Sequence, residues 1–348
     1  MAQEAPYWNT GKNGVILAGG GLDGVFGAGV LSAIAALKFP IHHFQAISVG
    51  ALIGAQFIAD GCETAEIENN FRLIEGKLGL SFLFDKSLYA AFSRRNEPGL
   101  FSDDGIKALV YGKEGKGWKI RGIDAEKLIA SEIEMQIGVH NESEGCEYKI
   151  ISNRDPEIKK NPKKFLSFLV ASSSPQGLVP PQKIDGDYYS DGLYPKIKPS
   201  FRAGCNTVLL ILNDQPQVKK DIGKEPYLER LRIAFDIMHD KELVLAAERT
   251  KNDFPDLRIY NMGSPLSCVK KFSKMEDPVL QYDGQGKPLH KILIVITPKK
   301  KIGDLSGFHF KKGDITKAIE HGMEMGSEVL EKLAKLQAPP PFDNEKTT

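Results

Sequence analysis

Short apolar runs alternate along the chain with longer segments in which apolar residues recur at helical spacing. The continuous apolar runs predict buried strands over residues 15–18, 44–47, 207–212 and 291–296. Helical periodicity predicts helices over residues 25–37, 49–59, 63–77, 164–172, 228–249 and 315–336, the last of them capped by Asp314. This alternation predicts an α/β fold, with a mostly parallel central sheet flanked by helices.

Two further segments predict antiparallel hairpins. The apolar residues of segment 133–139 alternate with polar ones, as in a half-buried strand, and residues 148–152 provide its hairpin partner. Asp185-Gly186 predicts a tight turn between residues 183–184 and 188–189.

We expect a single α/β domain over residues 14–336, long enough to bury a sizeable core. A polar segment, 1–13, precedes it, and a loop-rich excursion interrupts it at 262–290. Residues 337–348 contain three consecutive prolines among polar residues, which predicts a disordered tail.

The composition excludes several classes of protein. The chain of 348 residues carries 46 Lys+Arg against 45 Asp+Glu, and this balance argues against a dedicated nucleic-acid binder. Its four cysteines form no CxxC pair, so we expect reduced thiols and no metal site. The polar N-terminus is not a secretory signal, and no apolar stretch approaches the ~20 residues that span a bilayer. We therefore expect a soluble cytoplasmic protein without a cofactor.

Glycines gather between residues 19 and 29, where a predicted strand passes into a predicted helix. Exposed N–H groups of such a loop bind an anion, which is either a phosphate or the oxyanion of an acyl transfer. Gly19, Gly21 and Gly24 also satisfy the dinucleotide pattern G-x-G-x-x-G. That pattern requires an acidic residue about 20 positions later. No carboxylate lies between Asp23 and Asp60, so the acyl-transfer alternative gains weight.

Ser48 lies between a predicted strand and a predicted helix, in the context of a nucleophile elbow. The alternative is an ordinary helix-capping serine. A nucleophilic serine needs a base. None of the seven histidines follows a glycine-marked strand end, whereas Asp191-Gly192 follows a predicted strand. The alternative for Asp191-Gly192 is a second Asp-Gly turn.

Taken together, these motifs resemble the patatin-like phospholipase family. The resemblance covers about residues 14–195, and the last helix, with Gly322, is also similar. It depends on four segments in the same order as in the family: Gly19–Gly24, Ala46–Gly50, Ala171–Pro175 followed by Val179–Pro181, and Asp191–Gly192.

The resemblance implies a three-layer α/β/α lipid acyl hydrolase, a peripheral enzyme of lipid degradation that acts through a Ser–Asp dyad. Ser48 would be the nucleophile, and Asp191 would accept its proton and return it to the leaving group. Backbone N–H groups of Gly20, Gly21 and Val49 would form the oxyanion hole. Gly19, Gly24, Gly50 and Gly192 would support these motifs.

Three positions depart from the family pattern. Asp23 stands where the family usually has Arg or Lys, Ala46 replaces the first glycine of G-x-S-x-G, and Leu193 replaces a small residue. These departures leave open a catalytically weak, lipid-binding relative. The second alternative is a nucleotide- or phosphate-binding protein that uses the Gly19–Gly24 loop.

Two kinds of segment suggest contact with lipid. Residues 78–95 are rich in aromatic side chains and form either core helices or the wall of an acyl-chain pocket. Basic runs at 159–164 and 299–301 are either solvated loops or transient contacts with an anionic membrane surface.

Overall fold

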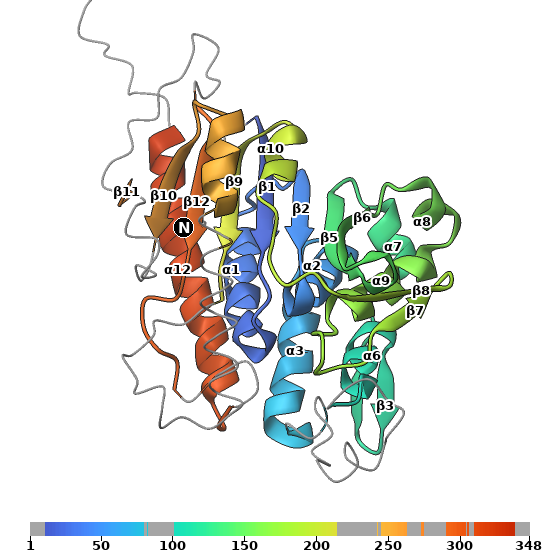
Figure 1. Ribbon diagram of the computed structural model, residues 1–348. Coiled ribbons are helices and arrows are strands. Elements are labelled where there is room, and N and C mark those ends of the chain that lie inside the picture. The colour runs from blue at the N-terminus through green and yellow to red at the C-terminus, as the bar shows by residue number, and fades with distance from the viewer. Residues whose placement is uncertain are drawn as a thin grey trace, which may run out of the picture.

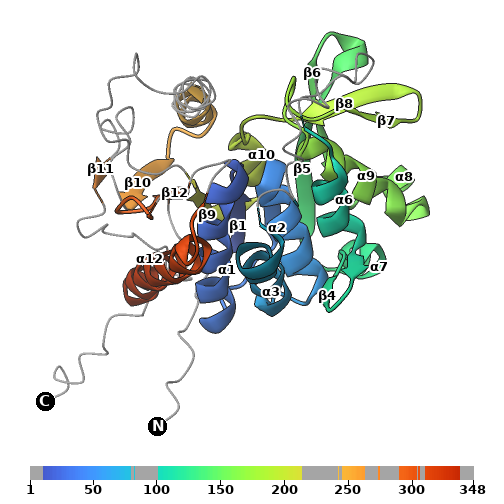
Figure 2. The same ribbon diagram turned by 90° about the horizontal axis from the view of Figure 1, so that it is seen from below.

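A ten-stranded sheet lies between two layers of helices in the part of the chain that the computed structural model describes (Figures 1 and 2). The described residues are 11–79, 82, 101–213, 242, 245–262, 273–274, 290–303, 305 and 310–337. From one edge of the sheet to β5, the strands are β11 (Ser273–Lys274), β10 (Arg258–Met262), β12 (Ile292–Ile296), β9 (Cys205–Ile211), β1 (Lys12–Leu17), β2 (His43–Ala46) and β5 (Glu134–Asn141). Strands β6 (Glu147–Ser152) and β8 (Asp187–Asp191) also pair with β5, and β7 (Gln182–Ile184) pairs with β8.

All neighbouring strands from β11 to β5 are parallel, whereas β6, β7 and β8 join the sheet antiparallel. The sheet is thus mostly parallel, as the sequence predicted. A separate hairpin consists of β3 (Lys113–Gly115) and β4 (Trp118–Ile120).

Helices cover both faces of the sheet, as Figure 2 shows. The α-helices are α1 (Val25–Ala36), α2 (Ser48–Ala59), α3 (Ala65–Leu73), α6 (Asp104–Tyr111), α7 (Ala125–Ala130), α8 (Pro156–Lys160), α9 (Pro162–Ser172), α10 (Lys198–Arg202) and α12 (Asp314–Gln337). Shorter turns are η1 (Gly21–Gly24), η2 (Ile74–Leu78) and η3 (Glu142–Glu144). Residues 245–253 are also helical and lie on the same face as α10 (Figure 2).

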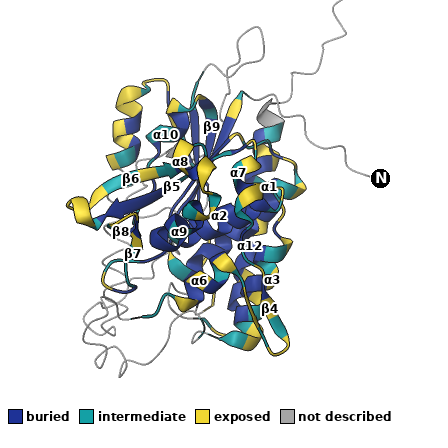
Figure 3. Cartoon of the chain, turned by 90° about the vertical axis from the view of Figure 1, so that its right-hand side faces the viewer, coloured by how far each residue is buried: buried dark blue, intermediate teal, exposed yellow. Residues whose placement is uncertain are grey.

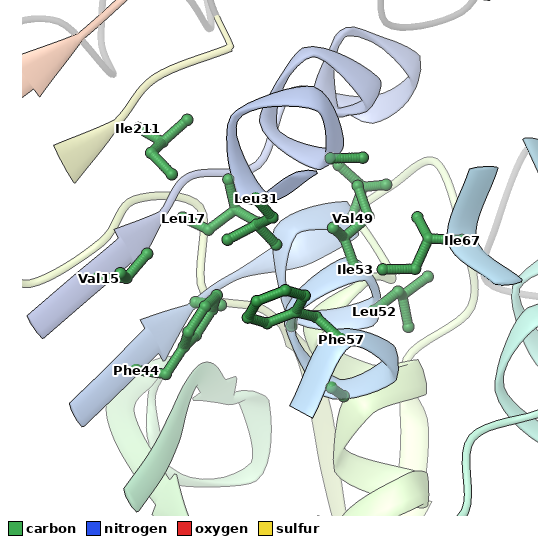
Figure 4. Close-up of a cluster of buried hydrophobic side chains, with 14 of the residues drawn as sticks. Val15, Leu17, Leu31, Phe44, Val49, Leu52, Ile53, Phe57, Ile67 and Ile211 are labelled. Atoms are coloured by element: carbon green, nitrogen blue, oxygen red, sulfur yellow. The ribbon is translucent and has the colours of Figure 1, made fainter. Parts of the chain in front are cut away.

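The two faces of the central strands are buried in two separate apolar clusters. In β1, Val15 and Leu17 belong to the larger cluster, which includes residues of α1, α2, α9 and α12. Their neighbour Ile16 points to the other face, toward residues of α10 and β9. Figure 4 shows Val15, Leu17 and Phe44 packed against side chains of α1 and α2. Burial on both faces explains why this strand has a continuous apolar sequence.

Most predicted elements are present, with shifted ends. Both hairpins are confirmed: β5 pairs with β6, and β7 pairs with β8. At the second turn Asp185 and Gly186 both have positive φ, as a type I′ turn requires. The helix predicted over 63–77 is shorter: α3 ends at Leu73, and the π-helical turn η2 continues it. Most of the predicted helix 228–249 and of the excursion 262–290 lies outside the described residues.

Of the four cysteines, Cys62, Cys146 and Cys205 are free thiols, and Cys268 lies outside the described residues. None of the helices that the structure describes is long and apolar enough to cross a bilayer.

Helix α12 packs directly on α1 through glycines on both helices. A Cβ atom on Gly322 would lie 2.0 Å from the main-chain oxygen of Phe26, and one on Gly29 would lie 2.0 Å from that of Ile319. Each glycine therefore allows the backbone of the other helix to come closer than any side chain would permit.

We predict that Gly322→Ala destabilises the protein by about 1–3 kcal/mol, because the new methyl group must separate α12 from α1. Gly76→Ala is the matched control, since a Cβ atom at Gly76 meets no atom within 4 Å. Urea unfolding measures both changes. Equal stability of the two variants would contradict the close packing of the helices.

Candidate active site

Two strands that run toward each other share one edge of β5. The last residue of β2, Ala46, pairs with Ile137, and the last residue of β8, Asp191, pairs with Val139. Strand β6 pairs with residues 136–141 of β5, which overlap the residues that pair with β2 and those that pair with β8. Because each edge of a strand pairs with one neighbour at a time, β6 occupies the opposite edge of β5. Strands β2 and β8 therefore lie end to end, and only Gly138 of β5 separates the positions where they stop.

One residue, Ile47, separates β2 from Ser48, which begins α2 in a strained conformation. Its φ is 54°, in the left-handed region that favours glycine. The turn is tight because Gly50 lies against the end of β1, where a Cβ atom would lie 2.5 Å from the main-chain oxygen of Ala18. Ala46 is fully buried within β2. The sharp change of direction therefore falls at Ser48 and Gly50, and an alanine at position 46 is compatible with it.

Two serines at the end of α9 hold the backbone of Ser48. The Ser48 N–H donates to Ser172 Oγ over 3.1 Å, and the Ser172 hydroxyl donates in turn to the main-chain oxygen of Gly138 over 2.8 Å. The Ser173 hydroxyl donates to the main-chain oxygen of Ser48 over 3.0 Å. These bonds fix the strained residue to β5, which is how a sparsely populated conformation persists in a folded protein.

Asp191 is buried at the end of β8, with 3% of its surface exposed. Its N–H donates to the main-chain oxygen of Ser174 over 3.0 Å, in the same segment that holds Ser48. Its carboxylate Oδ1 accepts the N–H of Leu193 over 2.8 Å. Leu193 has a φ of 64°, in the left-handed region that favours glycine. The carboxylate is thus held by the turn that follows the strand.

The glycine loop after β1 lies against Ser48. A Cβ atom on Gly19 would lie 2.7 Å from Ser48 Cβ. Gly20 and Gly21 have φ values of 122° and 58°, and neither N–H has an acceptor among the described residues. The Val49 N–H lies in the first turn of α2, where N–H groups lack an intrahelical partner. The structure therefore brings the three predicted oxyanion donors to the same end of the sheet as Ser48.

The other residues of this loop are tightly packed. A Cβ atom on Gly24 would lie 2.3 Å from Val49 Cγ1, so the loop fits closely against the elbow helix. Asp23, in the turn η1, is buried with 6% exposure.

A group of aromatic residues lies beside Gly138, around the hydroxyl of Tyr148. This hydroxyl is buried without a hydrogen-bond partner among the described residues. Burial raises the pKa of Tyr148, and Tyr194 and Asp191 raise it further, so the hydroxyl stays protonated at neutral pH. The Lys196 ammonium lies 4.5 Å and 4.3 Å from the ring centres of Tyr148 and Tyr194, and burial lowers its pKa.

His140 lies beside Asp191. Its Nδ1 lies 2.8 Å from the main-chain oxygen of Asp191. Because a carbonyl oxygen only accepts, Nδ1 must carry the proton. The bond is therefore directed at the backbone of Asp191.

A cavity of about 530 Å³ lies at the opposite end of α2 from Ser48. Its lining includes Asp60, Glu66, Arg121 and Lys127. Since Asp60 follows the last residue of α2 and Ser48 is the first, this cavity is separate from the candidate active site.

The sequence did not assign roles to Gly138, Ser172 and Ser173, whose hydrogen bonds hold Ser48, or to Asn213, whose side chain donates to the main-chain oxygens of Ala18 and Gly19. The signal for Asn213 is a polar residue directly after the apolar run 207–212, at the end of a central strand. Ligands of open α/β sheets gather at such strand ends. Of the predicted pocket segment 78–95, residues 80–81 and 83–95 lie outside the described residues.

Comparison with known proteins identifies one family. The family model described as patatin-like phospholipase matches residues 15–194, just over half of the chain. Among solved structures, VipD from Legionella pneumophila aligns with a TM-score of 0.45 and 14% identity, covering 94% of this chain and 67% of VipD. Human GIVD cytosolic phospholipase A2, solved with a methyl gamma-linolenyl fluorophosphonate inhibitor and terbium chloride, aligns with a TM-score of 0.46 and 11% identity. That alignment covers 94% of this chain and 59% of the human enzyme. No curated protein sequence matches this chain.

We predict that Ser48→Gly is more stable than Ser48→Ala by about 1 kcal/mol, because only glycine adopts a φ of 54° without strain. Ser167, inside helix α9, is the control: there the alanine variant should be more stable than the glycine variant by about 1 kcal/mol. Urea unfolding of the four variants measures the two differences. The same order at both positions would show that Ser48 is not held in the left-handed region.

Proposed function

Because this chain belongs to the patatin-like phospholipase family, a family of lipid hydrolases, we propose that it cleaves carboxylic esters of lipids with Ser48 as nucleophile and Asp191 as base. The meeting of β2 and β8 at Gly138 carries this proposal. Because the two strands stop on either side of Gly138, Asp191 and the elbow that carries Ser48 lie next to each other along one edge of β5. The strained φ of Ser48 supports it further, since strain of this kind gathers at functional sites.

The first half of the reaction forms an acyl-enzyme. Asp191 accepts the hydroxyl proton of Ser48 as Oγ attacks the carbonyl carbon of the ester. The negative charge that develops on the carbonyl oxygen is stabilised by the N–H groups of Gly20, Gly21 and Val49. When the tetrahedral intermediate collapses, the bond to the alcohol breaks, and Asp191 returns the proton to the departing oxygen.

The second half regenerates the enzyme. Asp191 accepts a proton from a water molecule, whose oxygen attacks the carbonyl carbon of the acyl-Ser48 ester. Collapse of the second intermediate releases the fatty acid, and the proton returns to Ser48 Oγ. The balance is one ester and one water converted to one acid and one alcohol. No histidine takes part, and the bond of His140 to the backbone oxygen of Asp191 supports that assignment.

We predict that Ser48→Ala and Asp191→Asn each lower kcat for acyl esters by at least about 100-fold, because each removes one partner of the proton transfer. Asparagine keeps an oxygen that accepts the Leu193 N–H, so the turn should survive. Hydrolysis of a panel of acyl esters, with folding checked by circular dichroism, measures the loss.

Asp185→Asn provides the matched control, since Asp185 belongs to the other Asp-Gly pair of the same hairpin and should keep full activity. Labelling of Ser48 by a fluorophosphonate distinguishes the proposal from a lipid-binding relative and from a nucleotide-binding protein. Full turnover by Ser48→Ala would overturn the assignment. Loss of turnover in His140→Ala, with Asp191 intact and the fold unchanged, would replace the dyad by a triad.

Contact with anionic membranes is a second part of the proposal, based on the basic run at 159–164. Lys159, Lys160 and Lys163 are exposed and have no carboxylate partner among the described residues, whereas Lys164 is paired with Glu157 over 2.7 Å. In the second run, Lys299 is paired with Glu328, so fewer of its charges are available. Figure 3 shows exposed residues on α8.

We predict that the protein binds vesicles containing anionic lipid and that changing Lys159, Lys160 and Lys163 to Gln weakens binding by about 100-fold. Each lysine near such a surface contributes about 1 kcal/mol. Sedimentation with anionic and with neutral vesicles measures the difference. Equal binding to neutral vesicles would contradict the electrostatic contact.

A further inference from the structure

The side chain of Asn213 joins three parts of the backbone around the glycine loop. Asn213 is the second residue after β9 and is buried, with 1% of its surface exposed. Its Nδ2 donates to the main-chain oxygens of Ala18 and Gly19, both over 2.8 Å. Its Oδ1 accepts the N–H of Gly27 over 3.1 Å. Both donors and the acceptor of the amide are thus used, and the reverse orientation would bring like groups together.

The bond to Gly19 determines the direction of a predicted oxyanion donor. The carbonyl of Gly19 and the N–H of Gly20 belong to one trans peptide plane and point in opposite directions. Asn213 holds that carbonyl on its own side of the loop, where a Cβ atom on Gly20 would lie 3.4 Å from Asn213 Cβ. Ser48 lies against the loop at Gly19. The Gly20 N–H therefore points away from Asn213.

The bond to Gly27 fixes the helix that follows the loop. Gly27 is the third residue of α1, whose own N-cap residue, Gly24, has no side chain to accept an N–H. Asn213 provides this acceptor from the far end of β9, 186 residues along the chain. The loop is thus fixed at both ends by one side chain, at Ala18 and Gly19 before it and at Gly27 after it.

We propose that Asn213 is a positioning residue for acyl transfer, which holds the Gly19–Gly20 peptide so that the Gly20 N–H meets the oxyanion. This inference depends on the proposed function of Ser48 and the glycine loop. It assigns Asn213 no contact with the substrate. Its effect must therefore appear in the transition state, where the charge develops, and not in substrate binding.

Asn153 provides a matched control within the same chain. It is also fully buried, with its Oδ1 accepting the Met135 N–H over 2.9 Å. Its Nδ2 donates to two main-chain oxygens, those of Leu128 and Ile133, over 3.1 and 3.0 Å. It therefore makes the same three kinds of hydrogen bond near the start of β5, away from the glycine loop. A purely structural effect should be similar at both positions.

The experiment compares Asn213→Ala, Asn213→Asp and Asn153→Ala in the full chain, with rates expressed per folded molecule. We expect both Asn213 variants to lose about 10- to 100-fold in kcat with KM within about twofold, as for a weakened oxyanion hole. Fluorophosphonate labelling of Ser48 should slow by a similar factor. Aspartate can still accept the Gly27 N–H but cannot donate to the carbonyls of Ala18 and Gly19. A fall in kcat of the Asn213→Asp variant would therefore come from the lost bonds to the loop.

Three outcomes would overturn the inference. The first is an Asn213→Ala enzyme with the kcat and labelling rate of Asn153→Ala. The second is a loss confined to KM, and the third is an Asn213→Asp enzyme with wild-type kcat. If the wild type hydrolyses acyl esters and Ser48→Ala does not, these results reject the role of Asn213 alone. If the wild type neither hydrolyses esters nor is labelled at Ser48, the proposed function fails and this inference fails with it.

Discussion

The backbone pairing along one edge of β5 is the constraint on which the candidate site depends. A parallel strand and an antiparallel strand reach this edge from opposite directions, and both stop at Gly138. Each then turns sharply, at Ser48 and at Gly192. A Cβ atom on Gly192 would lie 2.7 Å from the carbonyl of Gly138, so the second turn is tightly packed against β5, as the first is against the end of β1. The positions of Ser48 and Asp191 are thus set by the register of β2 and β8 on β5, which many backbone hydrogen bonds maintain.

The turns store conformational strain, and neighbouring hydrogen bonds hold it. Ser48 and Leu193 both have positive φ, at a cost of about 1–2 kcal/mol for each residue with a Cβ atom. Ser172 and Ser173 bind the backbone of Ser48 on both sides, and the Asp191 carboxylate binds the N–H of Leu193. The same hydrogen bonds that compensate for the strain also restrict the backbone of Ser48 and the carboxylate of Asp191 to one orientation.

Local patterns predicted the parts of the site but not how they come together. A serine between an apolar strand and a small-residue helix predicted the elbow, and an Asp-Gly pair after a strand predicted Asp191, because both signals extend over a few neighbouring residues. The pairing of Asp191 with Val139 joins positions 52 residues apart in the chain, and no periodicity specifies which edge of β5 is free. The contacts of Asn213 with Ala18 and Gly19 join residues that are even farther apart in the chain. Short elements such as α6 and the β3–β4 hairpin were missed because few residues carry their signal.

The C-terminal half of the fold also has a consequence for the extent of the catalytic unit. The family model ends at residue 194, yet β1 pairs on one side with β9, and α1 packs against α12. A fragment cut at that boundary would leave the backbone groups of β1 unpaired along one edge and would uncover the glycine face of α1. Such an edge invites pairing with other chains, so the fragment should aggregate although it contains both Ser48 and Asp191. The smallest independently folding unit is therefore larger than the region that defines the family.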